Sequence, residues 1–161
     1  MVLDLSLVSI VNFITIISLL VVYSILDLRY KSVKNELVLV GFIIGGTISV
    51  FTGHFVTSVV LHATALLLTI PLVYILFRLG SIGGADAKVL FIVSLFSPGI
   101  ELGNWNQPVL EAILGLGGEL LIMLLGGYLY WRVKRNEEES TPPLLLFLLV
   151  GYLAIQIFAL F

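Results

Sequence analysis

Residues 5–26 read LSLVSIVNFITIISLLVVYSIL, an apolar stretch that contains no charged side chain. About 20 apolar residues are enough for an α-helix to cross the hydrocarbon core of a bilayer. The stretch has neither a basic region before it nor a small-residue cleavage site after it, so we expect it to stay in the protein and not to be removed as a signal peptide. It therefore predicts a first transmembrane helix, and Asp27 follows it directly.

The composition extends this prediction to the whole chain. Of the 161 residues, 60% are hydrophobic and 11% are charged, whereas soluble domains are about 45–50% apolar and about 25% charged. The apolar runs lack the alternation of barrel strands, and helices satisfy their own backbone in lipid. We therefore expect an all-α integral membrane protein, with residues 1–161 forming a single domain. The few scattered charges argue against nucleic-acid binding, and the absence of cysteine excludes a disulfide framework, a cysteine nucleophile and a Cys-ligated zinc ion.

The same length criterion predicts six transmembrane helices packed in one bundle. The fourth is the weakest of them, because it contains Lys88, Pro98 and Glu101. The predicted spans cover residues 5–26, 37–52, 55–77, 87–102, 108–131 and 144–161.

The basic residues support this number of spans. With six spans, all eight Lys and Arg side chains fall within or directly beside the first, third and fifth connections, on one side of the membrane. Because Lys and Arg are enriched in cytoplasmic loops, this side is predicted to face the cytoplasm, with both termini outside the cell membrane. The eight residues are Arg29, Lys31, Lys34, Arg78, Lys88, Arg132, Lys134 and Arg135.

Two aspartates stand at the ends of apolar segments on this predicted cytoplasmic side. Asp27 closes the first segment in VVYSILDLRYKSVKN (21–35), and Asp86 opens the fourth in SIGGADAKVL (81–90). An acid at the mouth of a membrane-embedded segment is costly, which makes it a functional-site candidate. Two adjacent carboxyl groups share one proton, so one can activate water while the other polarises a carbonyl. The pair therefore indicates an aspartic protease that requires no metal or cofactor.

Each aspartate alone also has a structural explanation. Asp27 can be an interfacial acid balanced by Arg29, and Asp86 can cap a helix after a flexible glycine turn. Their position on one face favours function. The helix dipole favours an ionised Asp86 at a helix N-terminus, so we expect Asp27, near a helix C-terminus, to hold the proton. Gly83 and Gly84 beside Asp86 leave backbone room for an extended peptide.

Three segments resemble one known family, the type IV prepilin peptidases and archaeal preflagellin peptidases, which are aspartic membrane proteases with a GxGD-type motif. Residues 83–88, GGADAK, resemble the relaxed form of that motif. Residues 27–35, DLRYKSVKN, are similar to the family's D-x-R…I-P-N segment, although Lys34 stands where proline is common. Residues 143–152, PLLLFLLVGY, are similar to the pattern of its last helix, with leucines in place of a phenylalanine and a proline. The resemblance covers the chain in order and spacing.

This resemblance implies removal of a short basic leader from a precursor of a pilin or an archaellin-type filament subunit at the cytoplasmic membrane face. The chain starts directly at its first span and has no cysteine. It therefore resembles the short, peptidase-only members, for which no methyl transfer, metal or cofactor is expected. The implied site consists of the catalytic Asp27 and Asp86, with Gly83, Gly84, Arg29, Lys88 and Asn35 in support of the site or the substrate.

Two other functions remain open for the sequence. Glu119 lies in the middle of the fifth predicted span and His62 in the third, and with the aspartates they would form the ion path of a small channel or transporter. Such a path needs polar groups through the depth of the membrane, whereas most of the acids gather at one face. Glu119 can instead bond to a helix partner such as His62. An inactive relative that acts as an assembly scaffold is the third possibility, and the intact motifs argue against it.

Overall fold

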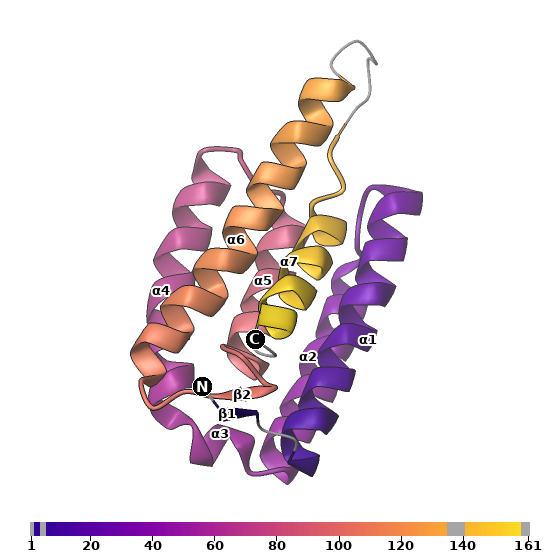
Figure 1. The fold of residues 1–161 in the computed structure, drawn as a ribbon. Helices are drawn as coiled ribbons and strands as arrows, with labels where there is room; N and C mark the ends of the chain where they lie inside the picture. The colour runs from indigo at the N-terminus through magenta and orange to yellow at the C-terminus, as the bar shows by residue number, and fades with distance from the viewer. Residues whose placement is uncertain (1, 4–5, 135–140, 159–161) are drawn as a thin grey trace.

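The structure is a computed structural model that describes residues 2–3, 6–134 and 141–158. In these residues the chain forms seven helices and two very short strands, and the long helices lie side by side (Figure 1). The elements are β1 (Val2–Leu3), α1 (Leu7–Tyr30), α2 (Asn35–Phe51), α3 (His54–Thr57), α4 (Val59–Arg78), α5 (Gly84–Phe96), β2 (Gly103–Asn104), α6 (Pro108–Val133) and α7 (Leu144–Phe158).

The described chain is helical, as predicted, apart from one short strand pair. β1 pairs antiparallel with β2, with Val2 opposite Asn104. The sequence does not predict these strands, because two residues are too few to show the alternation that marks a strand.

Three helices, α1, α4 and α6, are long and apolar enough to cross a membrane. Two further apolar helices, α2 and α7, are shorter, with 17 and 15 residues. Large hydrophobic side chains cover their outer surfaces, and Leu67 of α4 is 74% exposed. Soluble monomers rarely expose so much contiguous apolar surface, which is the surface that lipid requires. Residues 159–161 of the last predicted span lie outside the described residues.

Helix α1 carries the uncharged stretch and determines where Asp27 lies. The Ser6 hydroxyl oxygen accepts a hydrogen bond from the backbone N–H of Ser9 and caps the N-terminus of α1. The helix ends where Lys31 adopts a left-handed conformation with φ 50°. Because α1 continues beyond residue 26, Asp27 lies in its last turn.

The predicted span 55–77 is divided into two helices. α3 ends at Thr57, and Ser58 leaves helical geometry with φ −119° and ψ 34°. The Thr57 hydroxyl and the Ser58 N–H both donate to the His54 carbonyl oxygen, which closes the single turn of α3. Hydroxyl side chains that bind nearby backbone carbonyl oxygens can end a helix in this way. The apolar pattern of the sequence does not reveal this break. The long helix is therefore α4, Val59–Arg78.

The helix in the region of the predicted span 87–102 begins before residue 87 and ends before residue 102. α5 begins at Gly84 and ends at Phe96. Pro98 disfavours helical geometry at the residue before it, and Ser97 has φ −142° and ψ 68°. The chain then continues as a buried, non-helical segment through residues 97–101. The 13 residues of α5 rise only about 20 Å, against about 30 Å of hydrocarbon core.

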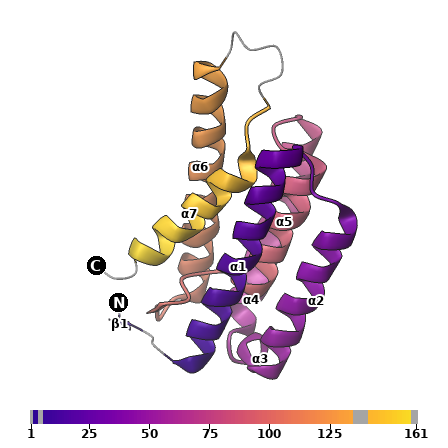
Figure 2. The same ribbon diagram turned by 90° about the vertical axis from the view of Figure 1, so that its right-hand side faces the viewer.

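Helix α5 lies in the middle of the bundle (Figure 2). Its Val89, Leu90 and Val93 are at most 1% exposed. α5 packs against α4 and α2 and also contacts α1 and α7, while α6 packs along α7 and α4. Asp86 therefore stands on the most enclosed helix of the molecule.

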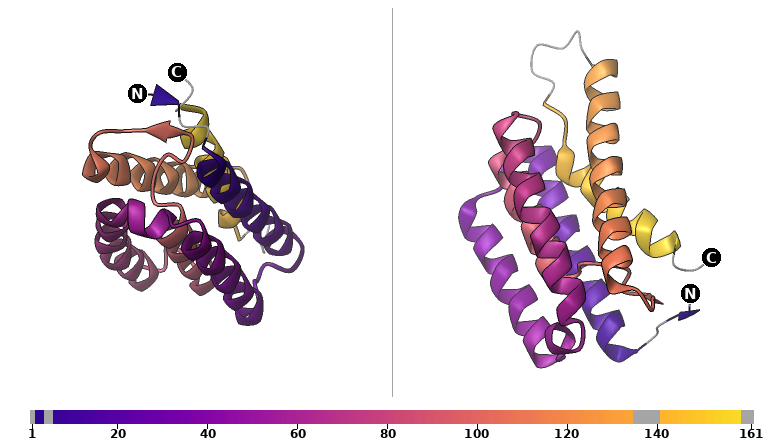
Figure 3. Two further views of the ribbon diagram at one scale, coloured as in Figure 1. Left: turned by 90° about the horizontal axis from the view of Figure 1, so that it is seen from below. Right: turned by 90° about the vertical axis from the view of Figure 1, so that its left-hand side faces the viewer.

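The connections define two ends of the bundle. At the end that we call the aspartate end, α1, α4 and α6 finish and α2, α5 and α7 begin (Figure 1). At the opposite end, the loop end, lie α3, the strand pair and the segment 97–107, which Figure 3 shows from below.

Candidate active site

Asp27 and Asp86 lie on one cavity at the aspartate end. Asp27 belongs to the last turn of α1 and Asp86 to the first turn of α5. The cavity has a volume of about 640 Å³, and Pro143 and Leu144 at the beginning of α7 form another part of its lining. A helix end and a helix start thus bring together two acids that are distant in the sequence.

The turn before α5 holds the Asp86 carboxyl group. The Gly83 N–H donates to Oδ2 of Asp86 at 2.9 Å, which is the bond of a capping box. The Asp86 side chain is only 9% exposed. A Cβ atom at Gly83 would lie 3.0 Å from Oδ2, so glycine lets the backbone approach the acid closely. Gly80 has φ 69°, a conformation that glycine adopts without strain.

Helix α7 reaches Asp27 with its first turn. Leu145 donates its backbone N–H to Oδ2 of Asp27 at 3.4 Å. Ser24, one turn earlier on α1, donates its hydroxyl to the Leu145 carbonyl oxygen at 3.0 Å. The N-terminus of a helix stabilises a nearby negative charge. The sequence signals the start of α7 through Pro143, but no local pattern indicates that this start faces Asp27.

Both acids hold a proton more tightly than they would in water. Both lie beyond the apolar stretches that the sequence assigns to the membrane. Burial raises the pKa of Asp86 to about 6 against the effect of the Gly83 N–H bond, and the charge of Asp27 raises it as well. Burial also raises the pKa of Asp27, while the Leu145 N–H lowers it. Desolvation therefore outweighs the helix dipole, and the proton that was expected on Asp27 is better held by Asp86.

Several other predicted site residues lie away from this cavity. Gly84 and Lys88 line an apolar groove on the other side of α5. Lys88 Nζ donates to Asn35 Oδ1 at 2.5 Å, which ties α5 to the start of α2 and not to either acid. Arg29 is exposed, and the basic side chain that lines the aspartate cavity is Lys31.

Besides Ser81 in the turn before Asp86, two hydroxyl side chains that the sequence did not single out line the cavity. They are Tyr130 near the end of α6 and Thr141 before α7. A hydroxyl group can donate to a peptide carbonyl oxygen or accept from an N–H. Their approach to the acids depends on how α6 and α7 pack against α1, so no local sequence signal reveals it.

At the loop end, buried polar side chains bind the backbone that follows α5. Within residues 95–100, the Leu95 carbonyl oxygen accepts from Nδ1 of His62 at 2.8 Å. The Ile100 N–H donates to Oε1 of Glu111 at 3.1 Å, and the Gly99 carbonyl oxygen accepts from Nε2 of Gln156 at 3.1 Å. Non-helical backbone at membrane depth is tolerated where protein surrounds it and satisfies its polar groups. These residues therefore hold the end of α5 in place.

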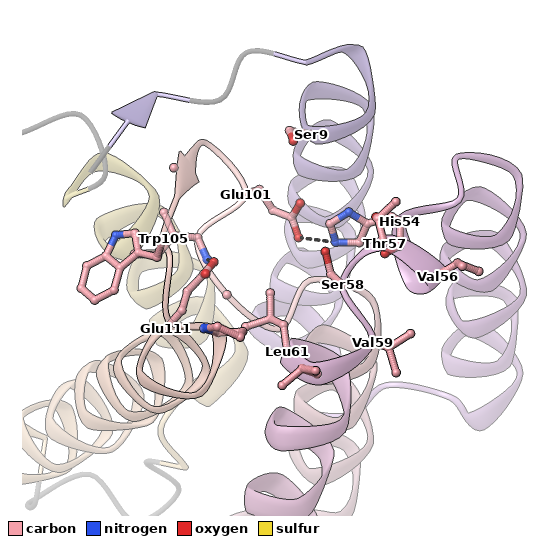
Figure 4. Close-up of a pocket in the computed structure, with 15 residues that line it drawn as sticks. Ser9, His54, Val56, Thr57, Ser58, Val59, Leu61, Glu101, Trp105 and Glu111 are labelled. Atoms are coloured by element: carbon pink, nitrogen blue, oxygen red, sulfur yellow. Dashed lines mark hydrogen bonds and ion pairs between the residues drawn. The ribbon is translucent and has the colours of Figure 1, made fainter.

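A second cavity, of about 460 Å³, lies at the loop end (Figure 4). Nε2 of His54 and Oε1 of Glu101 are 3.6 Å apart on its wall, so the pair links α3 to the segment after α5. Glu111 and Trp105 line the same cavity. Within the part of the chain that the structure describes, no group of three or more His, Cys, Asp and Glu side chains is arranged to hold a metal ion.

Glu119 lies in the loop-end half of the molecule and is only 3% exposed. It is near enough to Glu101 for the two charges to interact. The expected bond between Glu119 and His62 does not form in the described structure, in which Nδ1 of His62 binds the Leu95 carbonyl oxygen.

A helical membrane protein with two carboxyl groups on one cavity has the arrangement expected of a membrane protease. The family model of the type IV leader peptidase family matches residues 14–160, which is nearly the whole chain. The chain belongs to the type IV leader peptidase family and is a protease of the prepilin peptidase kind, as its motifs implied. No curated protein and no solved structure matches the chain.

Proposed function

We propose that the chain is an aspartic endopeptidase that removes the short basic leader from a precursor of a pilin or archaellin-type filament subunit. The observation that carries the proposal is the position of Asp27 and Asp86 on one cavity, where the charge of Asp27 raises the pKa of Asp86. Membership of the leader peptidase family supports the class of substrate.

In the proposed mechanism the two carboxyl groups act as general base and general acid. Ionised Asp27 takes a proton from water while the water oxygen attacks the scissile carbonyl carbon, and protonated Asp86 gives its proton to the carbonyl oxygen. The tetrahedral intermediate then collapses. Asp27 passes its proton to the leaving amine nitrogen, and a hydroxyl of the intermediate returns a proton to Asp86. The pair ends with one proton, as it began.

The proposed topology is a single membrane domain over residues 1–161 with six crossings and the aspartate end in the cytoplasm. α1, α2, α4, α6 and α7 each make one crossing, and α5 makes the remaining one together with the buried segment after Phe96. Every Lys and Arg in the described residues lies at the aspartate end, which supports a cytoplasmic position. Arg135, the eighth of the Lys and Arg residues in the sequence, lies outside the described residues. Both termini then face the outside of the cell membrane.

This topology suits a precursor whose basic leader stays in the cytoplasm while its hydrophobic helix enters the membrane. The scissile bond lies between these two parts, at the depth of the aspartate end. The peptide therefore reaches Asp27 and Asp86 without carrying its polar backbone into hydrocarbon, which would cost several kcal/mol for each unsatisfied group.

The test is cleavage of a panel of prepilin-like and archaellin-like precursors by the protein in liposomes. We expect Asp27→Asn and Asp86→Asn each to lower the rate on the order of 10³-fold or more. Because the two groups act as a unit, the double variant should be no slower than the slower single variant. Retained cleavage in folded Asp86→Asn protein would show that the proposal is wrong.

Glu119→Gln is the matched control, because it removes a buried acid of the same membrane protein that lies away from the aspartate cavity. We expect this variant to cleave the precursor at the wild-type rate. An ion path through Glu119 and His62 predicts a different pattern, in which the wild-type protein cleaves no precursor and Glu119→Gln stops proton flux into liposomes.

A further inference from the structure

An apolar groove of about 700 Å³ runs along the bundle between α2 and α4. Its walls are formed by residues within 35–42 of α2 and 70–77 of α4, and α5 forms its floor within residues 84–92. All three segments reach the aspartate end, where the α2 and α5 segments begin and the α4 segment ends. Each covers about two helical turns, or about 12 Å along the helix axis.

The groove is apolar along its length and polar at its mouth. Phe42, Ile70 and Phe91 are among the apolar side chains that line it. Lys88 and Asn35 stand at the mouth, joined by their hydrogen bond. Asn35 is a neutral partner, so this contact leaves the positive charge of Lys88 unbalanced. An occupant must therefore be apolar along two turns and polar where it leaves the groove.

One turn of α5 separates the groove from the aspartate cavity. Gly83 and Asp86 line the cavity, whereas their neighbours Gly84 and Ala87 line the groove. The separating turn carries small side chains or none on the groove side, so a chain can pass over it closely. A segment that leaves the groove at its mouth is thus delivered to the two acids within a few residues.

We propose that this groove binds the first two turns of the precursor's hydrophobic helix, directly after the scissile bond. The proposal rests on the proposed function and adds where the enzyme holds its substrate. A lipid tail also suits the apolar walls, but only the precursor has to present a peptide bond at the adjoining turn of α5. An amphipathic or apolar helix in a hydrophobic groove is a recurring mode of peptide recognition.

Disulfide cross-linking tests the contact directly, because the chain contains no cysteine of its own. Ile70→Cys places a thiol in the groove, and Ile75→Cys is the control on the same helix outside the groove. The two isoleucines are similarly exposed, at 56% and 50%. A precursor with one cysteine in the first two turns of its helix is oxidised with each variant in the Asp86→Asn background, which keeps it uncleaved. We expect about tenfold more cross-linked product at position 70. Equal cross-linking at both positions, or none at position 70, would overturn the proposal.

Filling the groove tests whether the contact matters for turnover. We expect Ile70→Trp to raise KM for the precursor about tenfold with little change in kcat, and Ile75→Trp to leave both unchanged. If the wild-type protein cleaves no precursor, the proposed function itself is wrong. If it cleaves the precursor and both Trp variants behave like wild type, the enzyme is a leader peptidase whose groove holds lipid, and only the groove proposal is wrong.

Discussion

The two ends of the bundle place buried acids in different surroundings. At the loop end, Glu111 binds the backbone N–H of Ile100, and its neighbours bind other backbone groups of the segment after α5. At the aspartate end, Asp27 and Asp86 each accept a backbone N–H as well, but they face one cavity and the charge of one raises the pKa of the other. Burial of an acid is therefore no sign of catalysis by itself. What distinguishes the aspartate end is that the two acids lining its cavity interact with each other. At the loop end Glu101 and Glu111 line the cavity, but Glu101 interacts with Glu119, which is not part of that lining.

The largest effect that this contrast predicts is the pH dependence of cleavage. The proposed mechanism requires a protonated Asp86, and burial raises the pKa of this carboxyl group to about 6. We therefore expect kcat/KM for the precursor to fall about tenfold for each pH unit above that value. It should also fall on the acid side, where Asp27 becomes protonated. Initial rates across the pH range check this, and a rate that still rises through neutral pH would contradict Asp86 as the proton holder.

The next effect concerns stability and has opposite signs at the two ends. The folded-state pKa of Asp86 is raised, so the stability that the protonated acid contributes is complete below about pH 4 and is lost as the pH rises through about 6. Asp86→Asn removes this loss of stability, because the asparagine side chain does not ionise. We expect it to stabilise the protein at mildly alkaline pH by up to about 3 kcal/mol, while it abolishes cleavage.

Thermal unfolding followed by tryptophan fluorescence measures this difference. Wild type and Asp86→Asn should unfold at similar temperatures in acid, where both side chains are neutral. A variant that is less stable than wild type at alkaline pH would show that the Asp86 carboxylate is well solvated or well paired.

At the loop end, removal of an acid should weaken the fold instead. Glu111→Ala leaves the buried N–H of Ile100 without its acceptor, which costs about 1–3 kcal/mol. Glu111→Gln keeps an acceptor oxygen and is the matched control. We expect the folded fraction of both variants to keep the wild-type kcat. Loss of cleavage in folded Glu111→Ala would mean that the loop end takes part in the reaction.

The smallest effect concerns the packing of α7, which brings Leu145 to Asp27. A Cβ atom at Gly151 would lie 3.1 Å from the Glu119 carbonyl oxygen of α6, whereas one at Gly117 would meet nothing within 4 Å. We expect Gly151→Ala to cost about 1–2 kcal/mol and Gly117→Ala to be neutral or slightly stabilising. Unfolding temperatures of the two variants decide this, and equal effects would contradict the close approach of α6 and α7.

The sequence predicts well what a single segment determines. The uncharged run 5–26 is long enough to indicate α1 without further information, and the acid after it falls in the last turn. The glycines before Asp86 indicate a turn followed by a helix start. Family resemblance then joins the two acids, although they are far apart in the chain, and the structure places them on one cavity.

The sequence predicts poorly what depends on contacts between segments. The predicted span 87–102 places both the start and the end of α5 too late, because apolar content hides the effect of Pro98 and of the side chains that bind the buried segment after Phe96. Lys31 rather than Arg29 lines the aspartate cavity, owing to the left-handed turn at Lys31. The sequence predicts the proton on Asp27 from the helix dipoles, with Arg29 and Lys31 opposing. It does not reveal the burial that raises the pKa of Asp86.

The shortness of α5 bears on how the chain enters the bilayer. A helix of 13 residues is too short to cross the hydrocarbon alone, and residues such as Asp86 and Lys88 oppose partitioning into lipid. α5 therefore depends on its neighbours for insertion, and Asp27 acquires its Leu145 partner only when α7 arrives. The cavity that holds the two acids is therefore complete only after α7 has been synthesised and has packed against α1.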